Sequence, residues 1–212
     1  MRLYETIKRF IGIKKKYLST KYLSIEGWLT PNEAYGLHEL ASQLLPNSTV
    51  VEIGSWKGKS TWCIAEGMKK GIIKCIDPFN GDGEKDSIDI YNKTRGEKDL
   101  LLQFKENLAA APKKVKIDPL KGYSNEFVGI IKDIDFLFID GDHSIESCKF
   151  DFENFEKDLK PGGFLAFHDY YKEREDLGPT WVIQNLVEKN IQYTHYMNYD
   201  SLCVFIKKSI VE

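Results

Sequence analysis

The stretch Val50–Ser60, VVEIGSWKGKS, decides how the rest of the chain is interpreted. Its first four residues predict the end of a buried strand, Gly54 and Gly58 enclose a tight turn, and the residues from Ser60 continue as a helix. A strand, a glycine turn and a helix in this order are typical of a nucleotide-binding corner, because glycines let a ligand approach the backbone and the helix start offers free N–H groups. An ordinary strand-to-helix turn of an α/β protein would also fit.

The glycine spacing differs from that of two common phosphate-binding motifs. A dinucleotide fingerprint requires G-x-G-x-x-G, whereas here three residues separate Gly54 from Gly58. A P-loop requires four residues between its glycines, so this spacing is one residue short. Neither template fits the stretch.

The stretch resembles motif I of the class I S-adenosylmethionine (SAM) methyltransferases, E/D-x-G-x-G-x-G, with Glu52, Gly54 and Gly58 in place and Trp56 instead of the middle glycine. The resemblance covers roughly residues 25–207 and includes the runs GWLTPNE, IDGDHS and LKPGGFLAFHDY. It implies SAM as the cofactor and a Rossmann-like methyltransferase fold. The expected cofactor-binding residues are Glu52, Gly54, Ser55, Gly58, Ser60, Asp77, Ser124 and Asp140.

The pattern along the chain predicts an α/β fold with five βα units. We expect a seven-stranded, mostly parallel sheet with right-handed crossovers, helices on both faces and an antiparallel hairpin at one edge. Thr30 is expected to cap a helix that begins at Pro31, with Glu33 only as an acid in its first turn. Strands are expected at 49–53, 72–76, 114–117, 134–140, 164–167, 193–196 and 202–206, and helices at 31–45, 59–69, 99–111, 145–159 and 181–189.

Two features follow the second predicted strand. Asp77 ends that strand roughly 20 residues beyond the glycine turn, where an acid can accept hydrogen bonds from ribose hydroxyls; with Pro78 it would otherwise merely begin a turn. The polar, glycine-rich segment 78–97 is predicted to be a mobile flap over the substrate side. Ser124 lies in the turn after the third strand, where the resemblance implies contact with adenine.

Polar residues at the ends of two later strands predict a second site. Asp140 ends one strand within IDGDHS, and His168 and Asp169 end the next within FHDY. Ligands of open α/β sheets bind at the carboxyl ends of the strands, and adjacent strands would bring these three residues together. Two carboxylates and an imidazole form a sensible divalent-metal site, and hard oxygen ligands suit Mg²⁺.

This set resembles the metal-dependent O-methyltransferases, more closely the macrolide and aminocoumarin sugar type, including the macrocin-type enzymes. In that family an acid or Asn is more usual at the position of His168. The acceptor hydroxyl must lose a proton, and the candidate bases are His143, whose unperturbed pKa suits the task, and Asp142, which would serve if a metal lowers the hydroxyl pKa. Both residues could instead cap the helix that follows.

Composition sets limits on domain organisation and partners. With 212 residues and 42% hydrophobic content, the chain is long enough for one α/β domain, expected at 25–212 after a basic extension at 1–24. The net charge of -2 gives no reason to expect a nucleic-acid partner. Residues 1–22 contain an amphipathic basic helix pattern that could pack on the body, pack on a second subunit of a homo-oligomer, or contact an anionic membrane surface.

The cysteines and the hydropathy pattern bear on location. The four cysteines are widely spaced and form no C-x-x-C pair, so we expect buried free thiols in a reducing compartment. No stretch has the roughly 18 apolar residues of a membrane span, and the N-terminus lacks the apolar core of a signal peptide. A cytoplasmic location is therefore expected.

The hypothesis with most support is a SAM-dependent O-methyltransferase, assisted by Mg²⁺, that acts on a hydroxyl of a small-molecule or glycan acceptor. One alternative is an enzyme of the Rossmann type that uses NAD or a nucleotide sugar, although the absence of G-x-G-x-x-G and the terminal hairpin count against it. Another alternative is a non-catalytic member that binds SAM.

Overall fold

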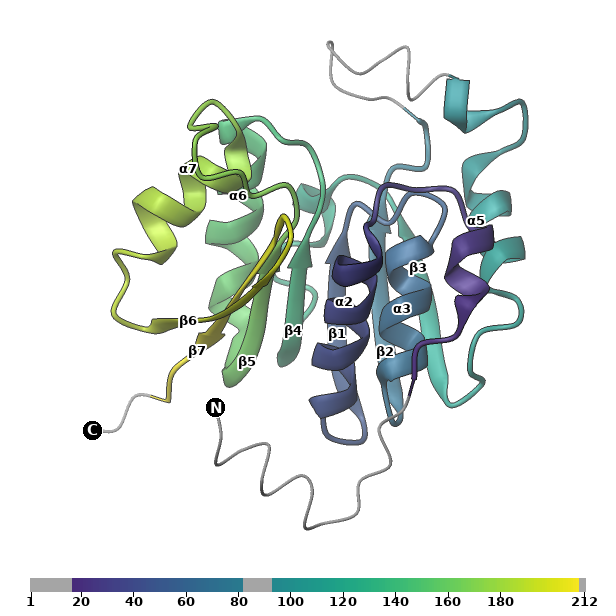
Figure 1. Cartoon of the computed structure of the whole chain (residues 1–212), viewed down its shortest axis with the longest axis horizontal. Coiled ribbons are helices and arrows are strands. Elements are labelled where there is room, and N and C mark those ends of the chain that lie inside the picture. The colour runs from purple at the N-terminus through teal and green to yellow at the C-terminus, as the bar shows by residue number, and fades with distance from the viewer. Residues whose placement is uncertain (1–16, 82–92, 210–212) are drawn as a thin grey trace.

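The computed structural model describes residues 17–81 and 93–209, and its strands form one sheet in the order β3-β2-β1-β4-β5-β7-β6 (Figure 1). Neighbours from β3 to β5 are parallel, and β7 pairs antiparallel with both β5 and β6. This confirms the predicted fold class. The strands are β1 (Ser48–Ile53), β2 (Gly71–Asp77), β3 (Val115–Lys121), β4 (Ile134–Ile139), β5 (Leu159–Phe167), β6 (Tyr193–Tyr199) and β7 (Leu202–Lys207).

Helices cover both faces of the sheet (Figure 1). Beside a short helical stretch at 93–95, the described residues form the α-helices α2 (Pro31–Gln43), α3 (Lys59–Gly67), α5 (Leu100–Leu108), α6 (Ile145–Phe155) and α7 (Gly178–Val182). Shorter segments are the 3₁₀ turns η1 (Thr20–Ser24), η2 (Ser124–Phe127) and η3 (Glu156–Asp158), and the π-helical η4 (Ile183–Val187).

The period of two along each strand divides the core into two layers. In β4, Phe136 and Phe138 pack with α2, α3 and α5, whereas Leu137 and Ile139 pack with α6, α7 and η4. Every residue of β4 except Asp135 is buried, which explains its nearly continuous apolar sequence. The four cysteines are free and buried, as predicted.

Three local predictions need correction. β5 begins at Leu159, not at Phe164, because Lys160–Gly163 forms an irregularity in the pairing of β4 with β5 and does not form a loop. The last helical segment begins at Gly178, three residues before Trp181, with Pro179 in its first turn. Thr30 and Glu33 form a complete capping box, in which the backbone N–H of each donates to the side chain of the other.

Two predicted features lie mainly outside the described residues: the amphipathic helix, which falls largely within 1–16, and the flap, which falls largely within 82–92. The described residues that precede α2 do pack on the domain, since Tyr22 and Ile25 are buried in the core beside α3. Among the helices of the described residues, none combines the length and the apolar character that a bilayer span needs.

Hydrogen bonds of the parallel sheet continue one residue past the strand ends. In each case the residue after a strand donates its N–H to a carbonyl of the neighbouring strand: Gly54 to Ile76 (2.9 Å), Asp140 to Ile53 (2.9 Å) and His168 to Ile139 (3.1 Å). The positions expected to carry the chemistry are therefore held in register by the same ladder that forms the sheet.

Only a glycine fits at position 54, because the backbone that follows β4 lies directly against it. Gly54 has a φ of +87°, and a Cβ atom there would overlap the carbonyl oxygen of Asp140. The glycine thus allows the turn after β1 to lie directly against the end of β4. This close approach places the predicted cofactor loop beside the group formed by Asp140, His168 and Asp169, which we call the acid cluster.

Gly54→Ala tests this packing, with Gly162→Ala as the matched control. Both glycines have positive φ, but nothing lies within 4 Å of a Cβ at Gly162. The control should lose roughly 1 to 2 kcal/mol of unfolding free energy from backbone strain alone, whereas Gly54→Ala should lose about 3 kcal/mol or more because a backbone atom must also move. Urea unfolding compares the two, and equal losses would contradict the proposed role of the β4 contact.

Candidate active site

The turn after β1 keeps a glycine-like path in spite of Trp56. Trp56 has φ +46°, between Gly54 at +87° and Gly58 at +88°, so the tryptophan adopts the left-handed conformation that a middle glycine would favour. Its indole lies 5.6 Å from that of Trp28, centroid to centroid. Gly58 is needed for packing, since a Cβ there would lie 2.8 Å from a methyl carbon of Leu108.

Glu52 lies beneath this turn in a polar cluster. It is fully buried, and its Oε2 accepts hydrogen bonds from the hydroxyls of Ser55 (2.7 Å) and Thr61. Burial raises the pKa of Glu52 to about 7, although hydrogen bonds from Ser60, Thr61 and Ser55 oppose the shift. The predicted cofactor residues Glu52, Ser55 and Ser60 thus stabilise the turn from inside.

Asp77 ends β2 and closes the same turn. Its carboxylate accepts hydrogen bonds from the backbone N–H groups of Trp56 (2.8 Å) and Phe79 (2.6 Å). Burial raises the pKa of Asp77, whereas these N–H groups lower it and the charge of Asp140 raises it further. Each carboxylate oxygen has a second lone pair, so the side chain can still accept bonds from a ribose.

Ser124 lies at the start of η2, near Asp77, because Gly122 donates its N–H to the carbonyl of Asp77 (3.1 Å). The Ser124 hydroxyl hydrogen-bonds to Asp151, a buried acid on α6. Burial raises the pKa of Asp151 to about 6, against the effect of that hydrogen bond. Asp151 was not predicted from the sequence, because an acid within an amphipathic helix carries no local signal of its contacts.

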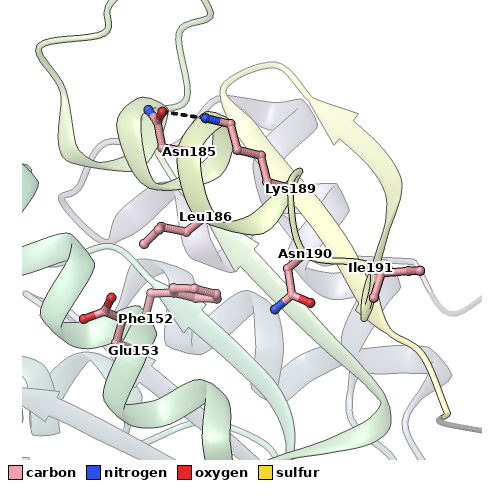
Figure 2. A pocket seen from close by; sticks show the side chains of 7 residues that line it. All are labelled: Phe152, Glu153, Asn185, Leu186, Lys189, Asn190 and Ile191. Atoms are coloured by element: carbon pink, nitrogen blue, oxygen red, sulfur yellow. Dashed lines mark hydrogen bonds between the residues drawn. The ribbon is translucent and has the colours of Figure 1, made fainter.

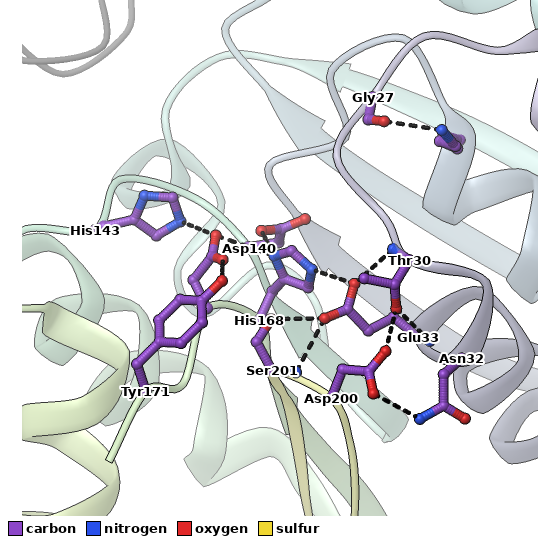
Figure 3. Close-up of polar contacts among 12 residues, drawn as sticks. Gly27, Thr30, Asn32, Glu33, Asp140, His143, His168, Tyr171, Asp200 and Ser201 are labelled. Atoms are coloured by element: carbon purple, nitrogen blue, oxygen red, sulfur yellow. Dashed lines mark hydrogen bonds and ion pairs between the residues drawn. The ribbon is translucent and has the colours of Figure 1, made fainter. Parts of the chain in front are cut away.

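The second predicted site assembles at the ends of β4 and β5, since Asp140 and His168 follow adjacent strands (Figure 3). The Nδ1 atom of His168 lies 3.1 Å from Asp169 Oδ2 and 3.2 Å from Asp140 Oδ1. Its Nε2 atom lies 3.2 Å from Glu33 Oε2. The His168 side chain, only 5% exposed, is therefore enclosed by three carboxylates.

This enclosure shifts the pKa of each member. Burial lowers the pKa of His168, but Asp140, Asp169 and Glu33 outweigh it and raise that pKa well above its usual range. Burial would raise the pKa of Glu33, yet hydrogen bonds from His168 and Ser201 lower it to about 2. The pKa of Asp169 is likewise lowered, since hydrogen bonds from His143 and His168 outweigh burial. These shifts favour a positively charged His168 surrounded by negatively charged carboxylates.

His143 and Asp142 take different positions after β4. The Nε2 atom of His143 lies 3.1 Å from Asp169 Oδ2, so the imidazole is paired with a carboxylate (Figure 3). Asp142 is exposed and accepts a hydrogen bond from the N–H of Ser144 (2.8 Å), the N-cap residue of α6. Asp142 therefore supports the helix start, as the capping interpretation expects, whereas His143 faces the acid cluster.

The acid cluster fits a divalent cation. Ligand atoms of Asp140, His143 and Asp169 lie within 4.8 Å of one another, and all three side chains are partly exposed. Two carboxylates provide the hard oxygen ligands that Mg²⁺ prefers. The structure thus adds His143 to the metal-ligating candidates, while both ring nitrogens of His168 already face carboxylates.

A cleft of about 330 Å³ opens beside this cluster. Its walls include the exposed aromatic rings of Trp28 and Tyr171, and His168 and Asp169 line it together with Gly27, Leu29, Thr30, Glu33 and Ser201. The Tyr171 hydroxyl donates to Asp169 Oδ1 (3.2 Å). This volume suits a small molecule or one ring system of a larger one.

A second cleft, of about 490 Å³, lies elsewhere (Figure 2). It is lined by Phe152 and Glu153 near the C-terminal end of α6 and by residues of η4 and the following turn, among them Leu186 and Ile191. The acid cluster lies instead before the N-terminal end of α6. The two clefts share no lining residue.

Residues 51–170, more than half of the chain, match the family described as "Methyltransferase domain". The chain belongs to this family. The predicted resemblance to class I methyltransferases is thereby confirmed. An uncharacterized protein of Acanthamoeba polyphaga mimivirus is 30% identical over 132 residues, which are 59% of this chain and 53% of the viral protein, so the chain spans about half the length of that relative.

Solved structures share the fold. The O-methyltransferase TomG of Streptomyces achromogenes, involved in tomaymycin synthesis and solved with SAM, has a TM-score of 0.62 at 13% identity, covering 96% of both chains. A putative caffeoyl-CoA O-methyltransferase of Staphylococcus aureus has a TM-score of 0.60 at 15% identity, covering 98% of both chains. At such identity these similarities establish the fold of the chain and not its substrate.

Two further residues of the candidate site, Glu33 and Lys57, were not predicted from the sequence. Glu33 was expected only as an acid in a first helical turn, and nothing local indicates that it reaches His168. Lys57, between the two glycines, is also buried and forms an ion pair with Glu26 (2.6 Å). A buried lysine needs a partner, but a sequence does not reveal which residue provides it.

Glu52→Gln tests the buried cluster. Because the pKa of Glu52 is about 7 in the folded state and 4.5 ordinarily, the folded state binds the extra proton, and the wild-type chain loses this stabilisation as the pH rises from about 4.5 to about 7. The variant does not titrate there. Its unfolding free energy relative to wild type should therefore rise by roughly 3 kcal/mol over that interval. Urea unfolding measures this difference, and a value independent of pH would contradict it.

Proposed function

We propose that the chain is a SAM-dependent methyltransferase that transfers a methyl group to a hydroxyl of a small-molecule or glycan acceptor, with Mg²⁺ assistance. The observation that carries the proposal is the position of Asp140. Its carbonyl lies against Gly54 in the turn after β1, and its carboxylate lies 3.2 Å from His168 in the acid cluster. A cofactor on that turn and an acceptor at the cluster would be neighbours.

The cofactor is proposed to lie over the carboxyl ends of β1 to β3. Gly54 and Trp56 are only partly buried in the turn, Asp77 ends β2, and Ser124 follows the end of β3. Of the other predicted cofactor residues, Glu52, Ser55 and Ser60 act from below by fixing the turn. The SAM sulfonium supplies an activated methyl group, so the chain contributes chiefly alignment and exclusion of water.

The acceptor is proposed to bind in the cleft between Trp28 and Tyr171. Aromatic walls suit a planar ring or the apolar face of a sugar, and the hydroxyl to be methylated would point toward Asp169. Trp28 lines this cleft and also packs against Trp56 of the turn after β1. One aromatic pair would thus separate the two substrates from solvent on this side.

Asp140 and Asp169 are proposed to hold Mg²⁺, which would orient the acceptor hydroxyl and favour its ionised form. His143 is proposed as the general base, because Asp169 holds its imidazole at the edge of the cluster and histidine is the side chain most often used for proton transfer in active sites. Asp142 already accepts the N–H of Ser144, so we assign it to the helix start.

Asp77→Ala tests the cofactor placement. It should weaken SAM binding by roughly 1 to 3 kcal/mol, through lost hydrogen bonds to ribose. Calorimetry measures the affinity, and Asp118→Asn, which removes a carboxylate of β3 that pairs with Lys74, is the control. Unchanged affinity in Asp77→Ala would mean that the cofactor lies elsewhere.

Asp140→Asn tests the metal. The change removes an anionic ligand while nearly keeping its shape, so methyl transfer that depends on Mg²⁺ should be abolished, whereas SAM affinity should stay within a few-fold. A turnover assay with and without a chelator measures the first effect. Activity that is indifferent to the chelator would contradict Mg²⁺ assistance.

His143→Ala tests the base. The turnover rate should fall by roughly 10²- to 10⁴-fold, while the affinities for Mg²⁺ and SAM remain. Full activity would transfer the role of base to Asp142. A loss of Mg²⁺ affinity parallel to the loss of rate would instead make His143 a metal ligand.

A further inference from the structure

Glu33 is distant from the acid cluster in sequence but is joined to it through His168. The side chain is 3% exposed, and each carboxylate oxygen accepts two hydrogen bonds. Oε2 accepts from the N–H of Thr30 (2.8 Å) and lies 3.2 Å from His168 Nε2, and Oε1 accepts from the N–H (3.0 Å) and the hydroxyl (2.6 Å) of Ser201. These contacts fix the carboxylate on three sides.

His168 transmits this fixed position to the site. One ring nitrogen faces Glu33, and the other lies within 3.2 Å of both Asp140 and Asp169 (Figure 3). Carboxylates only accept hydrogen bonds, so the ring can satisfy them only by donating. Phe138 packs against the ring edge to face, with centroids 6.5 Å apart. The imidazole is therefore held in one orientation by Glu33 behind it and Phe138 beside it.

Two neighbouring carboxylates repel each other and would turn apart without a group between them. We propose that Glu33 is a positioning residue for methyl transfer, which acts through His168 to hold the Asp140 and Asp169 carboxylates at the separation that a divalent cation requires. This inference rests on the proposed function, since it takes these two acids as the metal ligands. Partners of ligand residues commonly determine metal affinity in this way.

A purely structural role for Glu33 is the competing explanation, because Glu33 completes the capping box of α2. Glu33→Gln separates the two roles, since Gln also serves at this position of a capping box but brings no charge to His168. Asp200→Asn is the matched control. Asp200 accepts from the Thr30 hydroxyl (2.6 Å) and from Asn32 (3.0 Å), so it supports the same helix start without reaching His168.

The experiment measures Mn²⁺ affinity by electron paramagnetic resonance in the full chain, together with thermal unfolding. Glu33→Gln should bind Mn²⁺ about 10- to 100-fold more weakly, while Asp200→Asn should bind as wild type. In turnover assays with SAM, Glu33→Gln should lower kcat and leave the KM for SAM unchanged, since the cofactor lies over other strands.

His168→Asn is the second variant, and it leaves the capping box of Thr30 and Glu33 in place. If Glu33→Gln folds poorly, wild-type Mn²⁺ affinity in His168→Asn alone would still overturn the inference. Where Glu33→Gln folds, the two changes can be combined. His168→Asn should weaken Mn²⁺ binding by itself, and adding Glu33→Gln to it should cause no further loss, because the two residues act as one unit. If the double variant instead loses Mn²⁺ affinity by the product of the two single losses, the inference is overturned. It is also overturned if Glu33→Gln binds Mn²⁺ as wild type does while Asp140→Asn no longer binds it. Wild-type affinity in Asp140→Asn would overturn the metal site of the proposed function itself.

Discussion

The close approach of Gly54 to the carbonyl of Asp140 is the constraint on which the rest of the site depends. It joins the turn after β1 to the end of β4, and the hydrogen bonds from Gly54 to Ile76 and from Asp140 to Ile53 continue the sheet through this point. A side chain at position 54 would force the two segments apart. The cofactor turn and the acid cluster are therefore parts of one edge, assembled by the backbone.

Two polar clusters lie on either side of this contact, and they differ in charge. Beneath the turn, Glu52 is surrounded by hydroxyls, and burial raises its pKa to about 7, so the cluster can be close to neutral. At the ends of β4 and β5, a histidine is shared among three carboxylates and retains its charge. The first cluster can stabilise a loop without creating a strong field, whereas the second concentrates negative charge where a cation would bind.

The residues that gather at this edge could largely be predicted from their positions at the ends of the predicted strands. Parallel strands bring their carboxyl ends to one edge of the sheet, whatever the sequence between them. Asp77, Asp140 and Asp169 could be found in this way. Glu33 could not, since its contact with His168 joins residues 135 positions apart through the packing of α2 and no local pattern encodes it. The start of β5 was missed for a related reason: Lys160–Gly163 contains turn-forming residues, but Leu159 before it and Phe164 after it both pair with β4, so the strand continues through it.

Diffraction from crystals soaked with Mn²⁺ and S-adenosylhomocysteine would test the central claim most directly, since it locates both partners of the reaction in one measurement. We expect an anomalous peak beside the carboxylates of Asp140 and Asp169 and cofactor density over Gly54, Trp56 and Asp77. An anomalous peak at another group of side chains, or cofactor density away from the turn after β1, would contradict it.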